Sequence, residues 1–516
     1  MKHILLFLAL CCTAYVVKSQ TTYMSLHTSG RFDKIISVSS GGYLTSGFDS
    51  NYAHQYVRWD AGFHPIWKLK LVDTSLIPFS NVIVEANDGN FYLGASSNVN
   101  NGSFTVTKVS STGSVLWQKR YTGSAVNYSL YAPTMNKAAG SDNGFVFGTG
   151  SCSLHNVFVK CDANGNINWQ KSYDYPLSSG VITCMSIVTE NNGYVLSSGF
   201  NIKSVLTTRI DTSGNILNYS AYTYTWTAQL MPQKLVKMPG NNGYAMIAQT
   251  NNSNNQIQYV AFYNNALSMT SFTELNVACQ QFTLYDITPV DNGTAVVVNG
   301  SVYDSSNTFR TAAIKISNTG NVLWKRFGKN SNTASVSFQH TEFTGVVANG
   351  NRTVHVGGGL YEGPFVAILD SMGNGICNEM NFTMSALPRT LIASSDLVTA
   401  FVSNAVAINT TLNYNQQVGY TPQIFCGSTV EGITELTAAN IDVYPNPASD
   451  KINIVTHQLF DHEANYSLFA IDGKLYRRNP YTNGMSISIN NLPEGVYILM
   501  ITDSKQTARA KVVVSH

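Results

Sequence analysis

Charged residues are scarce in this chain. Asp, Glu, Lys and Arg make up 12% of the 516 residues, and the formal net charge is only +2. About a quarter is usual for a soluble domain, so we expect no surface suited to nucleic acid or to an anionic membrane. After the first segment no run of about 20 apolar residues follows, and we therefore expect no transmembrane anchor.

Motifs of catalysis and metal binding are also missing. The sequence has no Gly-x-Ser-x-Gly elbow, no phosphate loop and no Asp-x-Asp-x-Asp-Gly calcium loop. Its histidines are scattered, and its cysteines never form paired C-x-x-C motifs. The acids considered for a glycosidase, Asp142, Glu190 and Asp291, stand directly before turn residues, which explains them structurally. We predict no catalytic residue, no metal site and no cofactor, which disfavours an enzyme without deciding the matter.

What the sequence does contain is a repeat of about 50 residues, clearest from Asp142 to Tyr173. Each copy opens with a turn on glycine, continues in an apolar β-prone strand and has a second turn of the form Asp/Ser-x-x-Gly. The opening glycines are Gly42, Gly89, Gly144, Gly193, Gly243, Gly293 and Gly350. The glycines of the second turn are Gly62, Gly113, Gly165, Gly214, Gly320 and Gly373.

This period predicts an all-β fold of four-stranded blades, because it is too long for leucine-rich, ankyrin or tetratricopeptide units. One blade cannot bury its own faces, so a ring must close. We predict a seven-bladed β-propeller, or an eight-bladed one, followed by a small C-terminal β-sandwich. Tyr23–Leu26 is expected to pair with the last blade. Residues 379–427, with strand-like runs at Leu397–Val402 and Ala405–Leu412, complete the seventh blade, form an eighth or pack over one end.

Two kinds of side chain recur beside the second turn. Trp117, Trp169 and Trp324 follow its glycine by four residues, and Trp67 by five. We predict that they pack between blades rather than stack on a ligand. Basic residues precede the same glycine by five residues, and two interpretations stay open, a ring around an anion or a solvated strand face that blunts edge pairing. These residues are Lys108, Lys160, Arg209 and Lys315.

The chain begins with the features of a signal peptide. Lys2 and His3 precede an apolar run from Ile4 to Val17, and a small residue, Ser19, stands at the expected cleavage site. We divide the chain into a signal peptide at residues 1–19, a propeller at 20–427, a linker at 428–440 and a C-terminal domain at 441–516. Export permits disulfides. The candidate pairs are Cys152 with Cys161, and Cys377 with Cys426.

The pattern changes in the C-terminal segment. Its ordered elements are Tyr444-Pro445-Asn446-Pro447-Ala448, Asp472-Gly473-Lys474, Leu492-Pro493-Glu494-Gly495-Val496-Tyr497 and a closing strand at Lys511–Val514. Strands are expected at Tyr466–Ile471, Met485–Ile489, Val496–Ile501 and Ala508–Val514. With these elements the segment resembles the type A C-terminal sorting domain, or Por secretion tail, of the type IX secretion system of Bacteroidetes.

The resemblance implies export in two steps. The signal peptide leads to the periplasm, and the outer-membrane type IX machinery then recognises the C-terminal domain, after which the cargo is released or attached to the cell surface. It also implies a set of sorting residues, which are Tyr444, Pro445, Asn446, Pro447, Gly473, Gly495, Tyr497 and Lys511. The repeats resemble uncharacterised β-propeller repeats fused to this domain. Their Asp-x-x-Gly-x-x-x-Trp pattern is similar to the blade motif of pyrroloquinoline-quinone enzymes, whose vicinal cysteine pair occurs here only in the signal.

Two functions remain open for the exported protein. The first is a secreted or cell-surface binding module, in which loops such as Asn251–Gln256 and Tyr303–Thr308 hold a glycan or a protein. The second is a hydrolase or lyase that acts on polysaccharide with acids from separate blades. We favour binding, because no candidate site stands out from the turn chemistry. The expected partners are the type IX machinery and an extracellular glycan or protein.

Overall fold

The computed structural model divides into two compact units, Met1–Thr429 and Val430–His516, which we treat separately. The described residues are 23–26, 30–49, 51–72, 81–97, 103–123, 131–150, 156–174, 183–200, 204–223, 229–251, 257–303, 305, 308–328, 342–359, 363–376, 379–394, 399–402, 405–409, 413–417, 422–426, 441–456, 460, 464–470, 475–502 and 507–516. They form antiparallel strands and turns, with one 3-10 turn at Asp291–Gly293.

The repeats of the first unit form four-stranded antiparallel meanders, which we call sheets 1 to 7. Five of them lie in separate hydrogen-bonded sheets, and the other two share a ten-stranded network through a bridge between Gly150 and Thr183. Sheets 1 to 4 contain β2 (Arg31–Ser37), β3 (Tyr43–Phe48), β4 (His54–Trp59), β5 (Pro65–Val72); β6 (Val82–Glu85), β7 (Phe91–Ser97), β8 (Ser103–Val109), β9 (Val115–Gly123); β10 (Tyr131–Lys137), β11 (Phe145–Gly150), β12 (Asn156–Cys161), β13 (Ile167–Asp174); and β14 (Thr183–Glu190), β15 (Gly193–Phe200), β16 (Ser204–Asp211), β17 (Ile216–Thr223).

The last three sheets continue the same pattern. They contain β18 (Gln229–Lys237), β19 (Tyr244–Asn251), β20 (Gln258–Tyr263), β21 (Met269–Val277); β22 (Gln281–Val290), β23 (Ala295–Tyr303), β24 (Phe309–Ser317), β25 (Val322–Gly328); and β26 (Glu342–Asn349), β27 (Arg352–Gly359), β28 (Gly363–Leu369). Sheet 7 takes its fourth strand from the N-terminal end, where β1 (Tyr23–Leu26) pairs antiparallel with β28. The predicted pairing of Tyr23–Leu26 with the last repeat is therefore confirmed.

Consecutive sheets pack face to face. Each core cluster of this unit draws its buried side chains from two neighbouring sheets, as where Tyr56 and Trp67 of sheet 1 meet Phe91 and Leu93 of sheet 2. Equivalent clusters join sheets 2 and 3, 3 and 4, 4 and 5, 5 and 6, and 6 and 7. The inner strands are covered on both faces, so β3, β4 and β20 are buried at every residue. This burial explains why these strands are rich in apolar residues rather than strictly alternating.

The first strands of the sheets also touch one another in sequence order. Contacts join β2 with β6, β6 with β10, β10 with β14, β14 with β18, β18 with β22, β22 with β26, and β26 with β2. Between the last and first sheets, the Thr344 hydroxyl donates to the Phe32 carbonyl at 2.5 Å, and the Asn349 amide donates to the Tyr43 hydroxyl. No hydrogen-bonded sheet among the described residues closes on itself.

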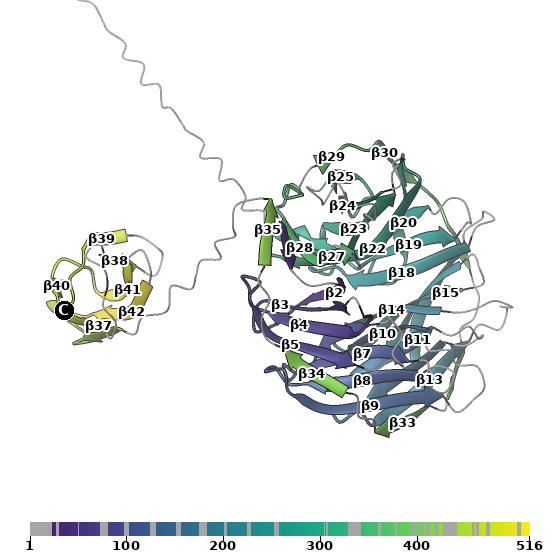
Figure 1. The fold of residues 1–516 in the computed structure, drawn as a ribbon, viewed down its shortest axis with the longest axis horizontal. Coiled ribbons are helices and arrows are strands. Elements are labelled where there is room, and N and C mark those ends of the chain that lie inside the picture. Colours follow the sequence, from purple (N-terminus) through teal and green to yellow (C-terminus); the bar gives the residue numbers. More distant parts are fainter. Residues whose placement is uncertain are drawn as a thin grey trace, which may run out of the picture. The chain divides into compact units, whose positions relative to one another are not determined.

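A retrograde segment, residues 379–426, adds a fifth strand to each of these sheets. Its strands β29 (Glu379–Met380), β30 (Met384–Pro388), β31 (Ile392–Ser394), β32 (Thr399–Val402), β33 (Ala405–Asn409), β34 (Asn413–Gln417) and β35 (Pro422–Cys426) pair with β25, β21, β17, β13, β9, β5 and β1. The segment therefore visits sheets 6, 5, 4, 3, 2 and 1 and finally 7. In Figure 1 the green β34 lies beside the purple β5.

This arrangement differs from the three roles expected for residues 379–427. The strands neither complete the seventh repeat nor form another one, and they lie on sheet edges. An edge strand presents unpaired backbone groups, and covering it removes a template for aggregation. The predicted runs at Leu397–Val402 and Ala405–Leu412 contain the strands Thr399–Val402 and Ala405–Asn409, and their other residues lie outside the described part of the chain.

The second unit has two small antiparallel sheets around one core. One sheet contains β36 (Ile441–Tyr444), β37 (Lys451–Thr456) and β40 (Ser486–Ser488), and the other contains β39 (Leu475–Pro480), β38 (Asn465–Ala470), β41 (Gly495–Thr502) and β42 (Thr507–Val514). Ile452 and Ile454 of the first sheet and Leu468 and Leu499 of the second belong to one buried cluster. Alternate residues of β41 are buried, as expected for a sheet covered on one face. Strand β39 has no counterpart among the predicted strands.

Candidate functional site

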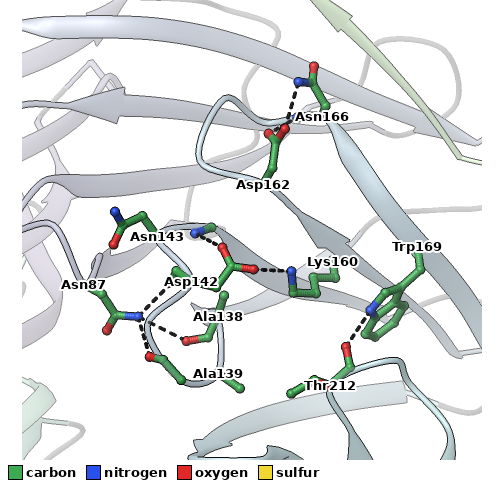
Figure 2. Close-up of polar contacts among 12 residues, drawn as sticks. Asn87, Ala138, Ala139, Asp142, Asn143, Lys160, Asp162, Asn166, Trp169 and Thr212 are labelled. Carbon is green, nitrogen blue, oxygen red and sulfur yellow. Dashed lines mark hydrogen bonds and ion pairs between the residues drawn. The ribbon is translucent and has the colours of Figure 1, made fainter.

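The second turn of each repeat is built as its sequence predicts. In Figure 2 the Asp162 carboxylate bonds to the Asn166 side chain, and its Oδ1 accepts from the backbone amides of Asn164 and Asn166 at 2.9 and 2.8 Å. Asp211 and Asp370 cap their turns in the same way. These bonds outweigh burial and lower the pKa of Asp162. Backbone capping therefore explains why the oxygen side chain and the glycine recur at the same spacing in the repeats.

The recurring tryptophans join each sheet to the turn of the next repeat. The indole of Trp169 donates to the Thr212 carbonyl at 2.9 Å, as Figure 2 shows. Trp67, Trp117 and Trp324 donate in the same way to Ser111, Ala163 and Ser371, at 3.0, 3.2 and 2.9 Å. The prediction that they pack between repeats is confirmed, and a ligand platform is not needed to explain them.

The turn glycines complete this tryptophan latch. A Cβ on Gly113 would lie 2.7 Å from the Trp67 ring, and one on Gly373 would lie 2.8 Å from the Trp324 ring. Both glycines also have positive φ angles, of 91° and 78°. Glycine is therefore required twice, by the backbone conformation and by the approach of the ring. Tryptophan and glycine recur together because each tryptophan lies on the glycine turn of the following repeat.

The recurring basic residues fit neither interpretation offered by the sequence. Lys108, Lys160 and Lys315 are buried, and each forms an ion pair with an acid at the opening turn of its own repeat. The partners are Asp88 at 3.1 Å, Asp142, and Asp291 at 2.8 Å. Figure 2 shows the pair of Lys160 with Asp142. These residues are thus neither a solvated face nor a free ring of charge.

The same network absorbs the acids that were considered for catalysis. Glu190 pairs with Arg209 at 3.0 Å and with Lys237 at 3.1 Å, and it accepts a hydrogen bond from the Tyr244 hydroxyl. Burial alone would raise the pKa of Glu190, but these partners outweigh it and lower the pKa. Asp142, Glu190 and Asp291 therefore each take part in a turn and in an ion pair.

A cavity of about 540 Å³ lies among the first strands of sheets 1 to 6. This volume falls within the range of small-molecule sites. A β-bulge interrupts β2, β14, β18 and β22 at matching places, and the next residue lines the cavity in each strand. Those residues are Lys34, Ser186, Lys234 and Asp286. Bulges re-aim side chains, which accounts for polar residues at this depth. We call Lys34, Lys234 and Asp286 the charged level.

A second level of the cavity is apolar. Residues two places further along the strands share a face with the first set. In β2, β14 and β18 they are Ile36, Val188 and Val236, which line the cavity together with Val84 of β6. We call them the apolar level. The sequence analysis missed this site, because the repeat was aligned on its turns and the first strands carry no common motif. The signal in the sequence was a charged residue directly before an apolar one in a first strand, at Lys34, Lys234 and Asp286.

The charges at the charged level are unequally satisfied. The Asp286 carboxylate pairs with Lys234 and accepts the amides of Ile287 and Val346 at 2.8 and 3.0 Å. Among the described residues Lys34 has no hydrogen bond or ion-pair partner. Burial lowers the pKa of the Lys34 amine, the Asp286 charge opposes that change, and the Lys234 charge adds to it. The charged level therefore contains one satisfied carboxylate, Asp286, and one amine, Lys34, without a partner among the described residues.

The predicted sorting residues come together in part in the second unit. The Asn446 side chain donates to the Lys511 carbonyl at 2.7 Å and accepts the Val513 amide at 2.8 Å. Ala448 extends this clamp, since its amide donates to the Val513 carbonyl at 2.9 Å. The Tyr444–Pro447 turn is thus fixed to the final strand, with Pro445 and Pro447 both preceded by cis peptide bonds and Tyr444 exposed.

The remaining predicted residues lie elsewhere. Tyr497 is buried, its hydroxyl donates to the Pro493 carbonyl at 2.7 Å, and burial raises its pKa. Gly495 begins β41 with a φ angle of 152°. Gly473 lies outside the described residues, as do most of the candidate ligand loops Asn251–Gln256 and Tyr303–Thr308. The structure thus unites the first motif with the last strand, and on that strand Val514 also pairs with Gly495 and Val512 with Tyr497.

Both predicted disulfides stay predictions, because each contains a cysteine outside the described residues. Cys161 itself is a free, buried thiol whose cross-strand partner is Phe145. Burial raises the pKa of the Cys161 thiol to about 12. Cys152 and Cys377 lie outside the described residues, so the pairing of Cys377 with Cys426 stays a prediction. Within the described ranges no three His, Cys, Asp or Glu side chains are grouped to hold a metal ion.

Comparison with known proteins bears mainly on the second unit. Residues 442–515 match the family model of the secretion system C-terminal sorting domain, and no curated protein matches the chain. The crystal structure of Chaetomium thermophilum Raptor is similar with a TM-score of 0.42 and 10% identity, over 68% of this chain and 30% of that chain. A protein of unknown function from Bacteroides caccae gives 0.34 and 11%, over 60% and 94%.

At these scores neither solved structure bears on function, and this chain spans under a third of the Raptor chain. No helix in the described part of the chain is long and apolar enough to cross a membrane. The family match and the clamped Pro-Asn-Pro turn concern the same residues. Residues 442–515 are therefore a C-terminal sorting domain of the type IX secretion system, which makes this chain a secreted or cell-surface protein.

Proposed function

We propose that residues 20–427 form a closed seven-bladed β-propeller, preceded by a signal peptide at residues 1–19 and joined to the sorting domain by a linker at 428–440. Three observations support closure. Each first strand contacts those of both neighbouring sheets, including β26 with β2. The core clusters join consecutive sheets. The retrograde segment reaches all of these sheets and ends on β1 beside the last repeat.

The function that this architecture supports best is binding outside the cell. The single observation that carries the proposal is the cavity among the first strands, whose lining combines a charged level with an apolar level. Pockets of this kind fix a ligand with a few polar groups and bury its body against apolar side chains. We therefore assign the exported protein as a binding module whose partner is a glycan or a protein with a protruding residue.

Catalysis has less support from the same residues. Among the residues that line the cavity only Glu85 and Asp286 are carboxylic acids. Glu85 accepts hydrogen bonds from the amide and hydroxyl of Ser39, and Asp286 is held by Lys234 and two backbone amides. A glycosidase needs one carboxyl group free to donate a proton and another free to attack or to activate water.

Binding and turnover are tested together on one sample. The full chain without its signal peptide is applied to an array of extracellular polysaccharides and host glycans, and bound material is then analysed for cleavage products. We expect retention of a subset of glycans with no new reducing or unsaturated ends. Release of such products at a rate proportional to protein concentration would show that the module is an enzyme.

A further inference from the structure

The cavity contains an imbalance of charge. The charged level holds two amines, Lys34 and Lys234, against the single carboxylate of Asp286. That carboxylate already has three donors, from Lys234, Ile287 and Val346. Lys34 has no hydrogen-bond or ion-pair partner among the described residues, although the Asp286 charge acts on it. Lys34 is half-buried in the cavity wall, and an amine without a partner in such a position can pair with the anionic group of a ligand.

Acceptor and donor groups beside the amine are unsatisfied as well. The Oε1 atom of Gln233, which lines the cavity, is buried and has no hydrogen-bond partner among the described residues. Asn299 is the cross-strand neighbour of Asp286, is fully buried, and lacks partners for both of its amide atoms. Buried polar groups are nearly always hydrogen-bonded. Of these atoms, Gln233 Oε1 belongs to the cavity lining, which indicates that this part of the wall accepts from a hydroxyl group of water or of a ligand.

The apolar level limits what the ligand can be. Ile36, Val84, Val188 and Val236 surround the part of the cavity next to the charged level. A free inorganic ion would leave this surface in contact with water. A molecule with an acidic group at one end and a ring with exposed C–H bonds at the other would contact both levels. A sugar ring with a carboxylate or sulfate group combines the acidic group, hydroxyl groups and C–H faces in one residue.

We propose that the cavity binds an acidic sugar residue, with its carboxylate or sulfate on Lys34, a hydroxyl group near Gln233 and its ring against the apolar level. This inference rests on the proposed binding function and narrows its ligand class. The acidic group accepts from the Lys34 amine directly, whereas the Asp286 carboxylate bonds to Lys234 and two backbone amides. Burial lowers the pKa of the free Lys34 amine. The negative charge of the bound anion opposes this effect.

Titration calorimetry of the full chain without its signal peptide tests the proposal with three sugars: glucuronate, glucose 6-sulfate and neutral glucose. We expect at least one acidic sugar to bind at least tenfold more tightly than glucose. Lys34→Gln removes the charge and is expected to weaken acidic-sugar binding at least tenfold without changing glucose binding. The matched control is Lys171→Gln, because Lys171 does not line the cavity and its amine donates to the Asn215 side chain. The control should bind like the wild type.

A second measurement keeps the test valid if Lys34→Gln fails to fold. Wild-type protein is treated with acetic anhydride, with and without each sugar, and acetylation of Lys34 is followed by mass spectrometry. Protection by an acidic sugar but not by glucose supports the proposal. Equal affinity for all three sugars, or Lys34 acetylation that no sugar slows, overturns it. In that case, retention of a neutral glycan on the array would still support the binding module, so the two failures are distinguishable.

Discussion

In both units of this chain, side chains that bond to the backbone hold distant turns in place. Such bonds recur along the repeat unit, whereas in the sorting domain Asn446 makes them. In the repeat unit a tryptophan indole donates to a turn carbonyl 43 to 47 residues away, in sheets 1, 2, 3 and 6. In the sorting domain the Asn446 side chain bonds to the backbone of a strand 65 and 67 residues away. The repeat unit therefore distributes its latches between neighbours, whereas the sorting domain joins its beginning to its end.

This difference predicts how each unit responds to damage. Losing one tryptophan latch leaves the others in place, so the cost should be local and measurable as a free energy of unfolding. Losing the Asn446 clamp frees the first motif from the final strand, and that surface is the part the export machinery must read. A small loss of stability in the sorting domain should then have a disproportionate effect on export.

The largest expected effect is the loss of export when residues 441–516 are removed. The sorting domain is a separate compact unit, so the repeat unit should fold and stay in the periplasm. We expect at least a tenfold drop of the protein in the medium or on the cell surface, measured by immunoblotting of cell fractions. Finding the truncated protein outside the cell at normal levels would contradict the role of the domain in sorting.

The next effect concerns the retrograde segment. Replacing residues 379–426 with a Gly/Ser linker of equal length exposes the outer edges of all the sheets that it covers. Exposed edges pair with other chains, so we expect loss of monomer on size-exclusion chromatography with light scattering. Replacing only residues 428–440 is the matched control and should leave the monomer intact. A monomeric variant lacking the segment would show that these strands do not protect the edges.

Trp67 offers the sharpest test of the latches. Trp67→Ala removes a buried ring that lies on Gly113 and donates to Ser111, and burial losses of this size cost about 3–5 kcal/mol. Trp67→Phe keeps much of the ring and loses the hydrogen bond, which costs about 1 kcal/mol. All six tryptophans precede residue 441, so fluorescence-detected urea unfolding reports on the repeat unit alone. Similar costs for both variants would mean that packing on the glycine contributes little.

Acid should weaken the repeat unit through His355. This histidine is fully buried against Phe343, and burial lowers its pKa to about 3 from 6.5. Between those values the unfolded chain binds more protons than the folded chain, so stability falls as pH drops from about 6.5 toward 3, by at most about 1.4 kcal/mol for each pH unit. His355→Gln should reduce this pH dependence in urea titrations from pH 7 to 4. An unchanged slope would show that other groups cause the acid sensitivity.

Asn446→Ala is expected to cause the smallest change in stability. Its effect on export should be larger. The variant loses two hydrogen bonds to the last strand, worth about 1–2 kcal/mol together. The Val513 amide should then exchange with deuterium roughly tenfold faster, and the exported fraction should fall. Asn490→Ala, at an exposed turn of the same domain, is the control for both measurements. Normal export with fast exchange would separate the clamp from recognition.

The sequence by itself determined the strands, the turns and the sorting domain, because these depend on local chemistry. Glycines with positive φ, aspartates that cap the next amides and tryptophans at fixed spacing recur at equivalent positions of several repeats. A period of about 50 residues could therefore be recognised in the sequence. The Pro-Asn-Pro element and its companions were likewise readable in order along the chain, and the family match covers the same residues.

Only the tertiary structure decided what is not local. Residues 379–426 contain short, unremarkable strand runs, and their pairing with sheets 6 to 1 and then 7 depends on edges that exist only after the repeats have folded. The partners of Lys108, Lys160 and Lys315 lie across a hairpin from them, so burial rather than sequence spacing selects them. Lys34, Lys234 and Asp286 are distant from one another in the sequence. They line the same cavity because each follows a bulge in a first strand.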